Sequence, residues 1–120
     1  MTPEELRSRT KRFAIGIVRF YQGLPRIQIG LILGRQLLRS GTSVGANYRA
    51  ACLGRSKAEF IAKLCIVLEE ADETIFWLEL LEESGILRKG QDRGLRDEAV
   101  ELACIFGASL RTARGSSVAR

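Results

Sequence analysis

The spacing of hydrophobic positions along the chain predicts four helices. Apolar side chains recur every three or four residues in four stretches, at residues 6–24, 29–51, 60–81 and 95–110. That period is typical of a helix with one buried face, and no alternation typical of strands stands out. Four helices with short connections predict an all-α, antiparallel up-and-down four-helix bundle at residues 1–114, followed by residues 115–120 as a flexible tail.

Local signals predict where the helices begin and how they pack. Residues 2–5 and 56–59 each place a hydroxyl side chain three positions before a glutamate, which is the arrangement of a capping box. The second helix is expected from about Pro25 to Leu53, with glycines and other small residues from Ser40 to Ala46. Each interior glycine costs on the order of 1 kcal/mol relative to alanine. We therefore interpret this stretch as the place where a neighbouring helix approaches closely.

Composition narrows the chemistry available to the protein. The chain has 120 residues, of which 46% are hydrophobic and 28% charged, so one globular domain is expected. It contains no histidine, which removes serine–histidine and cysteine–histidine nucleophiles and histidine-ligated metal sites. Three cysteines without a close pair argue against a disulfide framework and a zinc site. We expect no enzyme activity, no cofactor, no metal and no small-molecule substrate.

The same sequence indicates where the protein acts. The first residues lack the apolar run and cleavage pattern of a signal peptide. No segment reaches the roughly 18 continuous apolar residues of a membrane span. Because the cysteines are also expected to be reduced, we predict a cytoplasmic protein that has no membrane partner.

Charge is distributed unevenly along the chain. Residues 1–57 contain 11 basic and 2 acidic side chains, whereas residues 58–87 contain 1 basic and 8 acidic ones. Rows of arginines on one helical face can follow a phosphate backbone, but they can equally pair with the acidic third helix, in the same subunit or in the next. The candidate nucleic-acid-binding residues are Arg9, Arg12, Arg19, Arg35, Arg39 and Arg49.

Two further groups of residues are candidates for structural roles. A polar network between the second and third helices is expected, in which helix-packing hydrogen bonds are favoured over a ligand site. Its candidate members are Ser43, Asn47, Tyr48, Glu70 and Glu73. Phe76 and Trp77 lie about 100° apart on a helix and cannot both face one core. We expect one of them to pack at an oligomer interface, where tryptophan is enriched.

Three ungapped segments carry a family resemblance. They are residues 37–51 (LLRSGTSVGANYRAA), 55–61 (RSKAEFI) and 69–81 (EEADETIFWLELL). With them the sequence resembles the bacterial four helix bundle protein family, also called the 23S rRNA-intervening sequence protein family. The resemblance extends from about Phe13 to Leu110, with one departure at Ala50, where the family commonly has glutamate.

The resemblance implies a four-helix bundle that assembles into a homopentameric ring. The family is also similar to the accessory variability protein of diversity-generating retroelements, a basic pentamer thought to bind nucleic acid. The family-motif residues present in this chain carry no known catalytic role. They are Ser43, Asn47, Tyr48, Arg55, Ser56, Glu59, Phe60, Glu70 and Glu73.

Two functional hypotheses follow from the sequence. The first is a non-enzymatic oligomeric protein that binds RNA or DNA through arginines of the first two helices, as an accessory factor. The second is a protein–protein interaction scaffold without a nucleic-acid ligand, in which basic helices pair with acidic ones across subunit interfaces.

Overall fold

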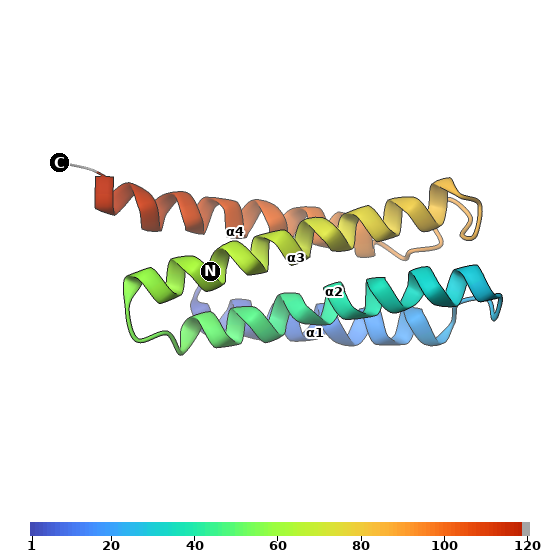
Figure 1. The fold of residues 1–120 in the computed structure, drawn as a ribbon, viewed down its shortest axis with the longest axis horizontal. Coiled ribbons are helices and arrows are strands. Elements are labelled where there is room, and N and C mark those ends of the chain that lie inside the picture. Colours follow the sequence, from blue (N-terminus) through green and yellow to red (C-terminus); the bar gives the residue numbers. More distant parts are fainter. Residues whose placement is uncertain (119–120) are drawn as a thin grey trace.

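The chain folds into four helices arranged side by side, and each helix runs antiparallel to the one before it (Figure 1). The computed structural model describes the backbone of residues 1–118 and the side chains of residues 1–115. The helices are α1 (Pro3–Gln22), α2 (Gln28–Cys52), α3 (Lys57–Glu83) and α4 (Leu95–Val118). Helix α1 also contacts α4, which closes the bundle. The molecule is a rod of 53 × 22 × 22 Å. The prediction of an all-α fold with four helices is confirmed, and residues 1–118 contain no strand.

The predicted boundaries hold with two differences. Helix α2 begins at Gln28 and not near Pro25, because Ile27 still has an extended backbone (φ −107°, ψ 148°) and serves as the N-cap. Helix α4 extends to Val118, into the segment expected to be a tail, while residues 119–120 lie outside the described residues. The division into residues 1–114 and 115–120 stays a prediction.

Side chains at the helix starts satisfy backbone groups that have no partner within the helix. At α1, the Glu5 N–H donates to Thr2 Oγ1 (3.0 Å) and the Thr2 N–H donates to Glu5 Oε1 (2.7 Å), so the predicted capping box is complete. The Thr2 hydrogen bonds hold the pKa of Glu5 below its ordinary value. At α3 the Glu59 N–H donates to Ser56 Oγ (3.1 Å), but the Glu59 carboxylate accepts from the Arg55 N–H instead of closing the box.

The glycines of α2 let α1 approach closely. A Cβ at Gly41 would lie 2.8 Å from the Ile17 side chain of α1, and one at Gly45 would lie 3.2 Å from the Thr10 carbonyl oxygen of the same helix. The interpretation of these small residues as a close helix contact is therefore confirmed.

The core lies along the rod axis and is almost wholly apolar. Its largest fully buried side chains are Phe106, Ile17, Leu37, Leu64, Leu78, Leu81 and Leu102. One polar pair lies between α2 and α3, where the fully buried hydroxyls of Ser40 and Thr74 are 3.0 Å apart. Thr74 Oγ1 also lies 2.7 Å from the Glu70 carbonyl of its own helix. These contacts satisfy both hydroxyls, and no buried side-chain nitrogen or oxygen in the described part of the chain lacks a partner.

Candidate nucleic-acid interface

Arg9 connects α1 to α4 through carboxylates. Its guanidinium donates to Glu98 through Nε (2.8 Å) and Nη2 (2.7 Å), and Nη2 also donates to Glu101 (2.8 Å). These hydrogen bonds, with Glu98 contributing most, raise the pKa of Arg9 above its ordinary value. The Arg9 side chain is only 18% exposed. The positive charge of Arg9 therefore pairs with acidic side chains within the bundle and is largely withheld from solvent.

Arg39 makes the corresponding connection between α2 and α3. It donates through Nη1 to Glu70 (3.1 Å) and through Nη2 to Glu73. The Glu73 carboxylate also accepts from Trp77 Nε1 (2.9 Å). The indole and then the guanidinium lower the pKa of Glu73, and the carboxylates raise that of Arg39. The Arg39 side chain remains 47% exposed, so this cluster lies at the surface of the α2–α3 seam.

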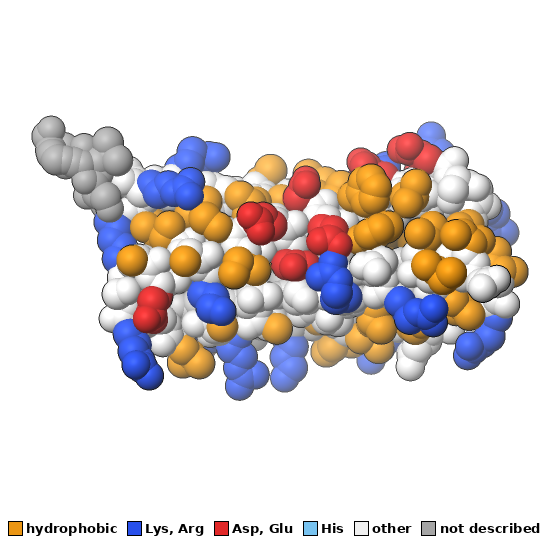
Figure 2. Space-filling view, in the orientation of Figure 1, with side chains coloured by type: hydrophobic (Ala, Val, Ile, Leu, Met, Phe, Trp, Pro, Cys, Tyr) orange, Lys and Arg blue, Asp and Glu red, His pale blue; other side chains and the backbone are white. Residues whose placement is uncertain are grey.

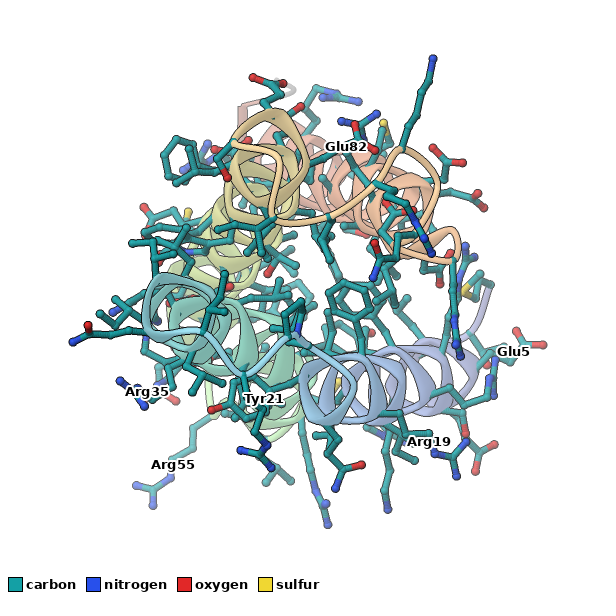
Figure 3. All side chains as sticks on the ribbon, turned by 90° about the vertical axis from the view of Figure 1, so that its right-hand side faces the viewer. Glu5, Arg19, Tyr21, Arg35, Arg55 and Glu82 are labelled. Atoms are coloured by element: carbon teal, nitrogen blue, oxygen red, sulfur yellow. The ribbon has the colours of Figure 1, made fainter. Side chains whose placement is uncertain are left out.

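The other four candidate arginines remain at the surface. Arg12, Arg19, Arg35 and Arg49 are exposed, and no ion pair involves them among residues 1–115. Arg19 and Arg35 point away from the bundle axis in Figure 3. Basic side chains also follow the lower edge of the molecule in Figure 2, where Figure 1 places α1 and α2. The structure thus separates the six arginines into two paired and four unpaired ones.

The five candidate residues of the polar network do not form one cluster. Ser43 Oγ donates to the Arg39 carbonyl (2.6 Å) and Asn47 Nδ2 donates to the Ser43 carbonyl (2.9 Å), so both side chains bond to their own helix. Tyr48 is buried and its ring packs on Phe106, with 5.3 Å between centroids. Burial and the nearby Cys52 thiol raise the pKa of Tyr48 to about 12. Of the proposed network, only the two glutamates of α3 meet, through Arg39.

Phe76 and Trp77 divide as their spacing on the helix requires. Phe76 is 51% exposed, whereas Trp77 is partly buried against the core and donates to Glu73. Their rings meet edge to face with 5.0 Å between centroids. A role for either ring at an oligomer interface stays a prediction.

A groove at the α1–α2 seam was missed by the sequence reasoning. It has a volume of about 400 Å³ and lies near the start of α1 and the end of α2. Its lining residues are Glu4, Arg7, Ser8, Lys11, Ala14, Thr42, Gly45, Ala46 and Arg49. Arg7, Lys11 and Ala14 share one helical face because they are four and three residues apart, which was the available signal. We call this feature the basic groove.

Other kinds of site are not found in the described part of the chain. Residues 1–115 contain no group of three or more acidic or cysteine side chains placed to hold a metal ion. None of the helices, as far as they are described, combines the length and the hydropathy needed to cross a bilayer. The three cysteines are free thiols.

The fold and its charged side chains define a small four-helix bundle with ion-paired seams and an exposed basic surface on its first two helices. This chain belongs to the 23S rRNA-intervening sequence protein family, whose model matches residues 5–108. A similar solved structure is a protein of unknown function from the S23 ribosomal protein family of Bacteroides thetaiotaomicron. It is 35% identical, has a TM-score of 0.85, and the match covers 92% of this chain and 99% of that one. A comparison with curated proteins found no match to the chain.

Proposed function

We propose that this protein is a non-enzymatic, oligomeric accessory factor that binds RNA or DNA through the exposed arginines of α1 and α2. One observation carries the proposal: Arg12, Arg19, Arg35 and Arg49 are exposed without an ion pair in the described chain. The only acidic side chains on these two helices are Glu4 and Glu5, in the first turn of α1. The surface formed by the two helices is therefore strongly positive.

A surface of this kind suits a phosphate backbone. Arginines that contact phosphates release condensed counterions, which gives an affinity that depends on salt and little on sequence. The family name refers to sequences within 23S rRNA, and the similar solved protein is assigned to a ribosomal protein family. Both names favour RNA as the ligand. Free cysteines suit the reducing cytoplasm, where such a ligand would be met.

Fluorescence anisotropy with a structured RNA and a duplex DNA, at several salt concentrations, tests the proposal. We expect saturable binding that weakens steeply with salt. The test variant replaces Arg12, Arg19, Arg35 and Arg49 with glutamine. The matched control removes four charges elsewhere, at Lys63, Arg88, Lys89 and Arg111, which are also exposed. The test variant should lose on the order of tenfold or more in affinity at low salt and the control much less; equal losses would contradict the proposed surface.

We also propose self-association, with the homopentameric ring of the family resemblance as the assembly. Ile29, Ile32 and Phe76 are 52%, 42% and 51% exposed, on the first part of α2 and the second part of α3. Hydrophobic side chains gather over this end of the two helices in Figure 2. Exposed apolar patches of monomers commonly mark an interaction site. We call these three residues the α2–α3 apolar patch.

The second candidate function is a scaffold without nucleic acid. The Arg39–Glu70 pair and the Arg39–Glu73 pair are the observation that favours it, because they show α2 and α3 attracting each other through charge. Glu69, Asp72 and Glu83 remain exposed on α3 and could take arginines of a neighbouring copy. Absence of RNA and DNA binding at low salt, together with an assembly that dissociates in high salt, would favour the scaffold.

A further inference from the structure

We propose that the basic groove is a binding site for a single phosphate group of a nucleic-acid strand. In this site Arg7, Lys11 and Arg49 bind the phosphate oxygens. The inference rests on the proposed function, since it names the part of the surface at which the strand is held most firmly. Arg7 and Lys11 lie outside the set of arginines picked out from the sequence. The argument depends on the lining of the groove, its charge and its size.

Three cations from two helices converge on the groove. Arg7 and Lys11 lie one turn apart on α1, and Arg49 comes from the last turn of α2. None of the three takes part in an ion pair within residues 1–115. Their charges are therefore not used to hold the helices together, in contrast to those of Arg9 and Arg39. A concave site lined by one sign of charge concentrates the field and attracts counter-ions.

The floor of the groove is built from small side chains. Ala14, Gly45 and Ala46 line it, so the cations flank a hollow and no bulky side chain fills it. At Gly45, an added Cβ would lie 3.2 Å from the Thr10 carbonyl oxygen, which shows how closely the helices meet beneath the groove. The volume of about 400 Å³ exceeds that of one phosphate group, so a phosphate can enter together with the sugar that it joins and with water.

The donors fit a phosphate group. Two guanidiniums and an ammonium supply N–H donors in several directions, and Ser8 adds a hydroxyl. The Thr42 hydroxyl donates to the Leu38 carbonyl of its own helix (2.7 Å), so we do not count it among the donors of the groove. Glu4 is the single acid at the groove, and it leaves a formal excess of two positive charges. A phosphodiester accepts through two unesterified oxygens, and its single negative charge offsets one of these two positive charges.

Amide chemical shifts in TROSY NMR spectra test the site with inorganic phosphate, at constant ionic strength and with chloride as the comparison. We expect phosphate to shift the amides of Ala14, Gly45 and Ala46 saturably, and chloride to leave them unchanged. Lys11→Gln with Arg49→Gln should abolish these shifts. Arg12→Gln with Arg19→Gln removes the same charge from exposed positions outside the groove and should retain them.

Glu4→Gln gives a change of opposite sign. It removes the one opposing charge and should tighten phosphate binding about threefold. Equal responses of the two double variants, or shifts reproduced by chloride, would overturn the site. A hexaglutamate peptide that shifts the same amides while phosphate does not would assign the groove to a protein carboxylate instead.

RNA titrations separate this inference from the proposed function. The Lys11/Arg49 double variant should bind RNA on the order of tenfold more weakly than the Arg12/Arg19 variant, with a salt slope lower by about 1. If RNA binds the wild-type chain but the two variants bind alike, the groove is wrong and the function stands. If no nucleic acid binds while phosphate still shifts the groove amides, the proposed function fails and an anion site remains.

Discussion

The neighbours of each arginine decide what its charge does. Arg9 and Arg49 both lie on helices rich in basic residues, yet Arg9 meets two carboxylates of α4 and Arg49 lines a groove with one acid. An exposed ion pair contributes only about 0–1 kcal/mol. The pairs formed by Arg39, whose side chain is 47% exposed, therefore orient the α2–α3 seam more than they stabilise the fold.

Glu73 makes the stability of the α2–α3 seam depend on pH. Its folded-state pKa lies below the ordinary 4.5, so the folded state favours the carboxylate. The contribution is complete above pH 4.5 and is lost as the pH falls through the lowered folded value. We expect Glu73→Gln to lower the free energy of unfolding by about 0.5–1 kcal/mol at pH 7, with the difference from wild type shrinking below pH 4.5.

Urea unfolding followed by circular dichroism, at pH 7 and pH 3.5, measures this effect. Glu69→Gln is the matched control, because Glu69 is exposed on the same helix and forms no ion pair within the described residues. It should change stability by less than about 0.5 kcal/mol at either pH. A Glu73→Gln deficit that persists unchanged at pH 3.5 would show that the carboxylate charge is not its source.

At the scale of the element, α2 forms two seams, one with α1 and one with α3. It presents glycines to α1 and Ser40 with Arg39 to α3. Glycine lowers the intrinsic stability of a helix, so α2 forms because its neighbours cover it. In its middle turns, a methyl group added at Gly41 would meet the buried Ile17 side chain of α1.

Gly41→Ala is expected to destabilise the bundle although alanine is the better helix former. The new Cβ would lie 2.8–3.0 Å from three atoms of the buried Ile17 side chain. Overpacking of this kind costs about 1–3 kcal/mol, which exceeds the gain of roughly 1 kcal/mol in helix propensity. The free energy of unfolding in urea measures the balance.

Gly107→Ala in α4 is the control with the opposite sign. The nearest atom to its added Cβ would be Arg111 Nη1 at 3.6 Å, an ordinary contact. Its stability should rise by about 0.5–1 kcal/mol. Two substitutions of equal chemistry in two helices thus test the close α1–α2 contact, and a stabilising Gly41→Ala would contradict it.

The helices were predictable from the sequence, and most partners of their charged side chains were not. Apolar spacing and capping residues are local signals, so the four elements and the role of the α2 glycines followed from them. Glu98 and Glu101 lie about 90 positions from Arg9 in the sequence. Their contact with Arg9 depends on which face α4 turns toward α1, and the sequence pattern does not specify that face. Predicting the basic groove would have required the register of α1 against α2, and a pattern within one helix does not specify that register.

At the scale of the whole molecule, the two parts of α2 present different surfaces, one apolar and one basic. The basic groove lies near the end of this helix, and the α2–α3 apolar patch includes the isoleucines of its first turns. Assembly through the patch would leave the grooves open. Charge pairing between copies would instead cover the arginines of α1 and α2.

The mass of the assembly distinguishes these arrangements. We expect light scattering after size exclusion to give about five times the 13.3 kDa chain, with no loss of mass in 1 M salt, because apolar burial is not screened. Ile29→Ser with Ile32→Ser should dissociate it. Ile15→Ser with Val100→Ser, exposed apolar residues of α1 and α4, should not. If salt alone dissociates the assembly, the subunit interface is formed by charged side chains and not by the α2–α3 apolar patch.

An even number of antiparallel helices returns the chain to the end of the rod at which it started. Helix α1 begins in the same half of the rod in which α4 ends (Figure 1), and Arg7 and Arg49 lie in this half as well. An affinity tag or fused protein at the N-terminus is thus attached near Glu4 and Arg7, which line the basic groove. An acidic tag at that position would compete with a ligand for the groove at high effective concentration. The α2–α3 loop lies at this end as well, whereas the α1–α2 and α3–α4 loops lie at the other. A fluorophore intended to leave the groove free therefore belongs in one of those two loops.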